Sequence, residues 1–290
     1  MWANVLTLTS ETFRDFARNN CSYFAAGIAY WALLSLFPLV LATISIVGYL
    51  YPTLEEQSEI VEGVIKLIPV SGEYLSEVVA EVVQARGVLG LLAVTGLLFS
   101  GAKVFASVRR GINQAWNISF QYPFLVARAI DLVLLLAAAL LVLMVVLLTT
   151  NATGLLIPID TLEAPGARLV VRLLSELLTL TFTLGIFILL YRYIPNTRVT
   201  WRDVWLGALV GCVLLNGFRI GLTWFIATFS GFNLLYGSLG ALIAVLVWVY
   251  MSSLALMWGA QVAATYSRLF GTVGRGRQQS PRGLGRLTNL

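Results

Sequence analysis

The stretch SLGALIAVLVWVYMSSLALMWGAQVAATY, residues 238–266, contains no charged side chain. A bilayer core of about 30 Å requires about 20 apolar residues when the chain crosses it as an α-helix. A helix satisfies its own backbone hydrogen bonds, for which lipid offers no partners. The stretch therefore predicts a transmembrane helix that is long enough to tilt.

Five further segments have the same apolar character, and they occupy residues 24–50, 88–107, 125–150, 170–194 and 204–228. The whole chain is 59% hydrophobic and 11% charged, with a mean hydropathy of +0.86. Soluble domains usually contain about 25% charged residues. We therefore expect an all-α integral membrane protein, in which residues 1–270 form a single domain of six transmembrane helices. Pro38 predicts a kink in the first helix.

Basic residues are concentrated on one side of the predicted helices. That side includes both termini and is rich in arginine, at positions 14, 18, 109, 110, 128, 192, 198, 202 and 268. The opposite connection, residues 51–87, contains seven glutamates. By the positive-inside rule, both termini are expected in the cytoplasm. Residues 271–290 are rich in Gly, Arg and Gln, which predicts a disordered basic tail that contacts lipid surfaces rather than nucleic acid.

Two regions outside these helices also show helical periodicity. Near the N-terminus, Trp2, Phe13 and Phe16 recur near helical spacing, which predicts an amphipathic helix on the membrane surface. Between the first two transmembrane helices, Thr53 and Glu56 form a capping-box pattern before an apolar stripe. We expect two interfacial helices in that connection, over residues 53–68 and 71–85.

Polar residues inside the predicted helices fall on single faces. In segment 204–228 these residues are Cys212, Asn216, Arg219 and Thr223. In segment 170–194 they are Arg172, Glu176, Thr179 and Thr183. At 3.6 residues per turn each set forms one stripe, and we expect the two stripes to face each other. The sequence thus predicts an ion pair of Glu176 with Arg219 about 9 to 14 Å below the outer surface.

Two interpretations of these residues remain open. In the first, the ion pair is structural, because buried ion pairs can fix helix register without any ligand. A second pair of this kind, Lys103 with Asp131, is predicted near the inner side. Alternatively, the stripes line a hydrated cavity in which an arginine holds an anion such as a phosphate, because guanidinium offers bidentate geometry. The candidate binding residues are Arg219, Arg172, Glu176, Asn216, Thr179 and Thr183.

Catalytic signals are weak. The chain has no histidine, and no Walker, GxGxxG or GxSxG pattern is present. The two cysteines, Cys21 and Cys212, suggest neither a disulfide framework nor a thiolate metal site. We therefore predict no enzymatic activity, no metal and no cofactor.

Three stretches carry a family resemblance: AAGIAYWALLSLFPLVLA (25–42), YRYIPNTRVTWRDVWLGALV (191–210) and YGSLGALIAVLVWVYMSSLALMWGAQ (236–261). Together they resemble the YihY/BrkB family of bacterial inner-membrane proteins, once mislabelled ribonuclease BN. The motif positions are Gly27, Tyr30, Pro38, Pro195, Tyr236, Gly237, Gly259 and Gln261. The resemblance implies a six-helix inner-membrane protein connected with virulence and lipid handling. The chain departs from the family at Asn216 and Gln261, where glutamate is common.

Three functional classes follow from these observations. The leading hypothesis is a transporter or lipid translocase that binds membrane lipids through their anionic headgroups, and an oligomer is compatible with it. The second is a non-transporting scaffold or envelope-assembly factor, in which the charge pairs are structural. A membrane ribonuclease is not favoured, because the chain lacks histidine and any metal cluster.

Overall fold

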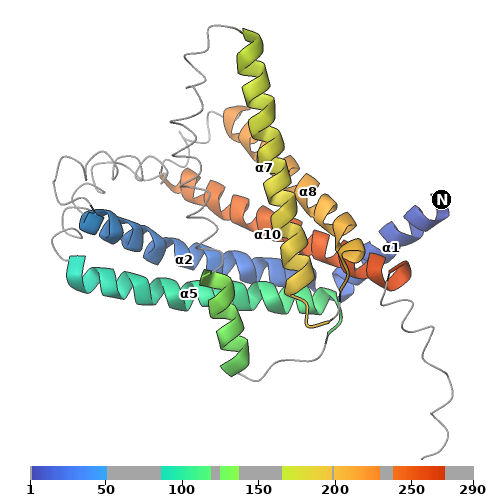
Figure 1. Ribbon diagram of the computed structural model, residues 1–290, viewed down its shortest axis with the longest axis horizontal. Helices are drawn as coiled ribbons and strands as arrows, with labels where there is room; N and C mark the ends of the chain where they lie inside the picture. The colour runs from blue at the N-terminus through green and yellow to red at the C-terminus, as the bar shows by residue number, and fades with distance from the viewer. Residues whose placement is uncertain are drawn as a thin grey trace, which may run out of the picture.

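The computed structural model describes residues 2–50, 86–118, 125–136, 165–197, 199–228 and 238–271. In this part of the chain all regular structure is helical (Figure 1). The helices are α1 (Trp2–Arg18), α2 (Cys21–Leu50), α5 (Arg86–Ala115), a helix over residues 125–136, α7 (Pro165–Tyr193), α8 (Trp201–Thr228) and α10 (Ser238–Leu269). The predicted helices in the glutamate-rich connection, residues 137–150 and the basic tail from 272 lie outside the described residues.

Helix bounds agree broadly with those predicted, and the main difference is in α5. This helix continues to Ala115, beyond the predicted end at residue 107. Arg109 and Arg110 lower the local hydropathy, but Val108, Ile112 and Ala115 are buried and give the extension an apolar face. The helix therefore extends past the segment predicted from the sequence, and its candidate membrane span also reaches Ala115.

Local sequence explains where two other helices begin. Pro165 is the first residue of α7, a position at which the missing proline N–H costs no hydrogen bond. At α8 the Asp203 carboxylate accepts hydrogen bonds from the Thr200 N–H at 3.0 Å and the Thr200 hydroxyl at 2.6 Å. The bond from the Thr200 N–H is one half of a capping box, and the Asp203 N–H donates to the Thr200 carbonyl at 3.0 Å, so these bonds together fix the first turn.

Four helices in the described residues are long and apolar enough to cross a membrane. Their spans are Cys21–Leu39, Leu92–Ala115, Trp201–Phe225 and Ile243–Leu269. In α7 a shorter apolar stretch, Leu180–Tyr193, is found. The fold is thus an all-helical one with several candidate membrane spans, and the arrangement of six transmembrane helices stays a prediction.

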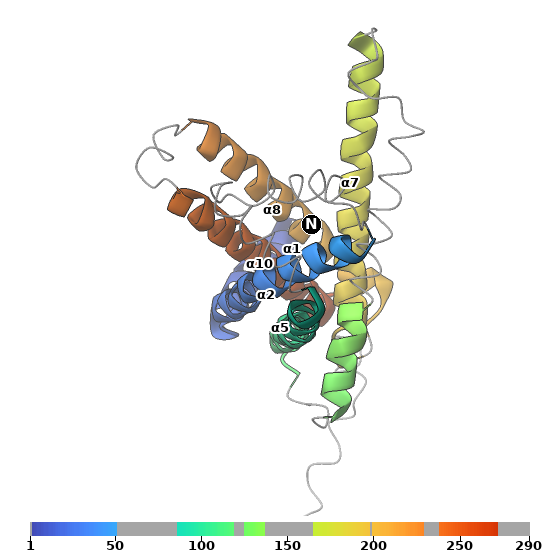
Figure 2. The ribbon, with the colours of Figure 1, turned by 90° about the vertical axis from the view of Figure 1, so that its left-hand side faces the viewer.

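The helices α2, α5 and α10 lie side by side, and α8 packs along α10 (Figures 1 and 2). Close approach of α8 and α10 depends on glycine: a Cβ at Gly207 would meet the backbone oxygen of Gly259 and, at 2.6 Å, the Cβ of Ala263. By contrast, a Cβ at Gly217 or Gly221 would meet nothing within 4 Å. A Cβ at Gly211 would lie 3.0 Å from the Phe187 ring and from the Tyr191 hydroxyl of α7. Gly207 and Gly211 therefore allow close helix packing, and Gly217 and Gly221 do not contribute to it.

The buried core is concentrated at one end of the bundle. There the ends of α2, α5, α7, α8 and α10 meet around Tyr191 and Met257, both fully buried. The same end carries Arg18, Arg109, Arg192, Arg202 and Arg268, and we call it the basic end. It matches the side on which the sequence places the cytoplasmic arginines, while the orientation in the membrane stays a prediction.

Candidate functional site

Arg219 lies in the second half of α8, inside the apolar span Trp201–Phe225. It is exposed, and so are its neighbours Ile220 and Trp224, each 64% accessible. Six residues separate Arg219 from the end of the span at Phe225, which is about 9 Å along the helix. Ile220 and Trp224 lie about 100° and 140° around the helix from Arg219. This stretch of α8 is thus open on more than one side.

The other polar residues of this stripe bond to their own helix. Asn216 donates from its side-chain amide to the Cys212 carbonyl at 2.9 Å, and the Thr223 hydroxyl donates to the Arg219 carbonyl at 2.8 Å. Such back-bonding satisfies a polar side chain without any partner helix. Among the four residues of this stripe, Arg219 therefore offers the most adaptable group to a ligand.

The predicted partners of Arg219 are on α7. The side chains of Arg172, Glu176 and Thr179 lie outside those that the structure describes, so the ion pair of Glu176 with Arg219 stays a prediction. Thr183 is partly buried. Contact between α7 and α8 occurs closer to the basic end, where the Cys212 thiol is 3.8 Å from the Leu180 carbonyl. From there the two helices diverge (Figure 2).

Asp131 has a different partner from the one predicted. Its carboxylate accepts hydrogen bonds from Arg109 Nε at 2.8 Å and Arg109 Nη2 at 3.1 Å, and both side chains are buried. Lys103 instead places its ammonium 5.5 Å from the centre of the Trp31 ring and 5.4 Å from that of Phe99. Six residues of helix separate Lys103 from Arg109, which turns the two side chains about 120° apart and offsets them by about 9 Å.

A buried polar cluster that the sequence did not reveal joins the start of α2 to α10. Asn19 donates to Gln261 Oε1 at 3.0 Å, and the Cys21 thiol lies 3.5 Å from the same oxygen. Gln261 Nε2 in turn donates to the Thr265 hydroxyl at 3.2 Å. Asn19 precedes the predicted membrane segment, so no polar anomaly within an apolar run marked it. The cluster fixes the register of α10 against the α1–α2 junction.

The motif positions differ in what they contact. Gly259 packs against Gly207 and Tyr191, and Pro195 is buried. Pro38 lies inside α2, which continues through it as one helix, and it packs against Gly96 of α5. A Cβ added to Gly27 would meet nothing within 4 Å. Tyr30 is exposed, and its ring meets that of Trp31 edge to face. Tyr236 and Gly237 lie outside the described residues.

The N-terminal helix α1 is held against α10 by charge and by stacking. Arg268 forms ion pairs with Glu11 at 2.7 Å and Asp15 at 2.6 Å. The Phe16 ring stacks on Trp258, with ring centres 4.0 Å apart. The helical prediction for this region is confirmed, and its placement on a membrane surface stays a prediction.

No group of three His, Cys, Asp or Glu residues that could hold a metal ion is found in the part of the chain that the structure describes. The buried acids there are used in ion pairs or caps, as Asp131 and Asp203 illustrate.

Comparison with known proteins places this geometry in context. A family model described as "Virulence factor BrkB" matches residues 12–283. A UPF0761 membrane protein of Pseudoalteromonas atlantica is 23% identical over 274 residues, covering 90% of this chain and 89% of that protein. Another, of Mannheimia succiniciproducens, is 27% identical over 258 residues, covering 86% and 85% respectively. These names state a membrane location and no reaction. No solved structure matches the chain.

Proposed function

The chain belongs to the BrkB family of membrane proteins, and from this premise we propose that it binds an anionic amphiphile, such as a lipid, and moves it within the cell envelope. In this proposal the protein spans the bacterial inner membrane with six helices and has both termini in the cytoplasm. The observation that carries the proposal is the exposure of Arg219 in an apolar stretch of α8 in which Ile220 and Trp224 are exposed as well.

An arginine exposed to hydrocarbon is costly, at about 2.5 to 3.5 kcal/mol at the centre of a helix by insertion measurements. The cost falls when the guanidinium reaches an anionic headgroup or water. Phosphate is the anion that suits it best, because its oxygens accept two parallel N–H bonds. Arg219 therefore favours a ligand with a phosphate-like head.

Apolar neighbours favour a ligand that also has hydrocarbon chains. Ile220 and Trp224 follow Arg219 on α8 within about one and a half helical turns and are each 64% exposed. A free ion would gain nothing from such surroundings, whereas an acyl chain would cover them. Exposed apolar side chains next to a cation thus support an amphiphilic ligand.

The proposal is tested with the full chain in lipid nanodiscs that contain phosphatidylglycerol. Arg219→Ala is expected to weaken binding of this lipid about tenfold, the size of one lost hydrogen bond to a charged group. The affinity of Arg219→Lys is expected to lie between those of the native protein and Arg219→Ala, because lysine keeps the charge and loses the bidentate geometry. Transfer of a labelled phosphatidylglycerol across liposome membranes should decrease in the same order.

Arg110→Ala is the matched control, since Arg110 is also an exposed arginine but lies at the basic end of α5. It should leave both measurements unchanged. Binding and transfer at the native level in Arg219→Ala would sink the proposal.

A scaffold function is the second candidate, and the paired charges of the basic end favour it. The bidentate contact of Arg109 with Asp131 shows that this chain does use buried charges to join helices. If Arg219 forms a structural ion pair with Glu176 in the same way, the double substitution Arg219→Met with Glu176→Met should leave fold, lipid binding and cellular phenotype intact. Loss of lipid binding in a folded double variant would instead favour the transporter.

A further inference from the structure

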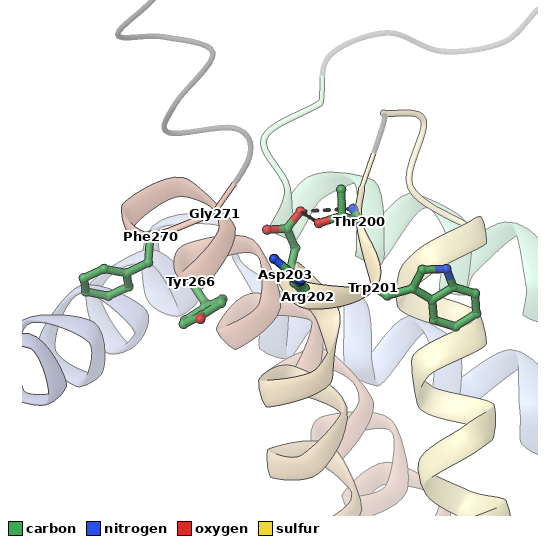
Figure 3. A pocket seen from close by; sticks show the side chains of 7 residues that line it. All are labelled: Thr200, Trp201, Arg202, Asp203, Tyr266, Phe270 and Gly271. Carbon is green, nitrogen blue, oxygen red and sulfur yellow. Dashed lines mark hydrogen bonds between the residues drawn. The ribbon is translucent and has the colours of Figure 1, made fainter.

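A pocket lies between the first turn of α8 and the last turn of α10 (Figure 3). Its volume is about 470 Å³, within the range of small-molecule and headgroup sites. The residues that line it are Thr200, Trp201, Arg202, Asp203, Tyr266, Phe270 and Gly271. None of them belongs to the Arg219 site, because Arg202 and Arg219 are separated by 17 residues of α8, about 26 Å.

The pocket lies where two candidate membrane spans end. One span begins at Trp201 and runs along α8, and the other runs along α10 and ends at Leu269. Residues 200 to 203 and 266 to 271 therefore lie at the level where hydrocarbon gives way to headgroups. This position favours a ligand that is itself part of the membrane.

Arg202 is the cation that the pocket presents. Its residue is exposed, and within the described part of the chain the structure records no hydrogen bond or ion pair for it. The adjacent carboxylate of Asp203 is buried and already accepts both hydrogen bonds from Thr200. Its charge is also offset by the N-terminal dipole of α8. The guanidinium of Arg202 is thus the group in this pocket that can recognise an anionic head.

Aromatic side chains form the rest of the wall. Tyr266 and Phe270 are one helical turn apart on α10, with ring centres separated by 5.7 Å. Trp201 is 54% exposed, and its ring lies 6.0 Å from the guanidinium carbon of Arg192. Tyrosine and tryptophan favour the membrane interface because they combine an apolar body with a polar tip. Such a wall suits the glycerol backbone and upper acyl chains of a lipid.

From this combination we propose that the pocket binds an anionic phospholipid of the leaflet that surrounds the basic end, with its phosphate on Arg202 and its glycerol region against Tyr266 and Phe270. The site is independent of the proposed function, because it uses other residues at the opposite end of α8. Bound lipid would brace α8 against α10 at the point where the two helices leave the membrane.

The test uses the full chain in mild detergent, titrated with short-chain phosphatidylglycerol, short-chain phosphatidylcholine and inorganic phosphate. The native protein should bind phosphatidylglycerol more tightly than phosphatidylcholine. Arg202→Ala should weaken phosphatidylglycerol binding about tenfold, since one charge-assisted contact is lost. Phe270→Ala should weaken it as well, while Arg110→Ala should leave it unchanged. Each variant is also titrated in the Arg219→Ala background, where the site of the proposed function no longer contributes to the signal.

Three outcomes would overturn the proposal. The first is native affinity in Arg202→Ala. The second is an equal loss in Arg110→Ala, which would reveal only a general effect of surface charge. In the third, inorganic phosphate binds as tightly as phosphatidylglycerol does, and Phe270→Ala leaves lipid binding unchanged. That result would assign the pocket to a free anion. Unfolding midpoints of all variants show whether a lost signal reflects lost structure.

Discussion

The two halves of α8 have similar hydrophobicity and different surroundings. In the first half, Val204 and Ala208 are fully buried, and Cys212 is nearly so. In the second half, Ile220 and Trp224 are each 64% exposed. Polar residues follow the same division, because Asp203 is buried in a capping box and Arg219 is exposed.

This contrast separates two uses of a polar side chain in a membrane helix. At the basic end, buried polar groups such as Arg109 with Asp131 and Asn19 with Gln261 join helices. In the second half of α8, Asn216 and Thr223 bond to their own helix and Arg219 is exposed. Substitutions of the buried polar groups should therefore change stability, and substitution of Arg219 should change binding.

The largest expected effect is that of breaking the buried ion pair. Arg109→Ala leaves the Asp131 carboxylate buried without its partner, which should lower the free energy of unfolding by about 3 to 5 kcal/mol. Chemical denaturation in detergent measures the change. The double variant Arg109→Met with Asp131→Leu should recover most of the loss, because it leaves no charge uncompensated. A single variant as stable as the native protein would contradict the assignment of this pair.

The next effect concerns the glycine contact of α8 with α10. A methyl group at residue 207 would overlap the backbone of Gly259 and Ala263. Gly207→Ala should therefore lower the free energy of unfolding by about 1 to 3 kcal/mol. Gly217→Ala is the matched control in the second half, where a Cβ meets nothing within 4 Å. It should be neutral or stabilise the helix slightly. Equal losses of stability in both variants would contradict the difference in packing between the two halves of α8.

A smaller effect is expected from the cap of α8. Thr200→Ala removes the hydroxyl that donates to Asp203 at 2.6 Å. Loss of such a cap usually costs about 1 kcal/mol. Unfolding curves should shift by that amount, and Thr200→Ser should restore the native value. A serine variant as weak as the alanine variant would show that the hydroxyl bond does not matter.

The smallest effect on stability should come from Arg219→Ala. Exposed charges contribute less than about 1 kcal/mol to folding, so the unfolding midpoint should hardly move while lipid binding decreases. A large loss of stability would mean that Arg219 is a structural residue like Arg109, and would move the second half of α8 into the same class as the basic end.

Local residue patterns predicted much of the helix content. Apolar runs located α2, α8 and α10 to within a few residues, and helical spacing located α1. Hydropathy failed at the end of α5, because Arg109 is charged yet buried in a pair. The predicted pair of Lys103 with Asp131 was wrong, because Asp131 pairs with Arg109. That partner depends on how helix 125–136 lies against α5, which a local pattern does not contain.

By itself, then, the sequence determined that this chain is a helical membrane protein and which residues are polar within apolar helices. Periodicity and hydropathy are local properties, so they can be read without knowing any neighbour. Only the tertiary structure decided what surrounds each of those residues. Gln261 is buried against Asn19, 242 positions away in sequence, while Arg219 is exposed in the half of α8 that diverges from α7.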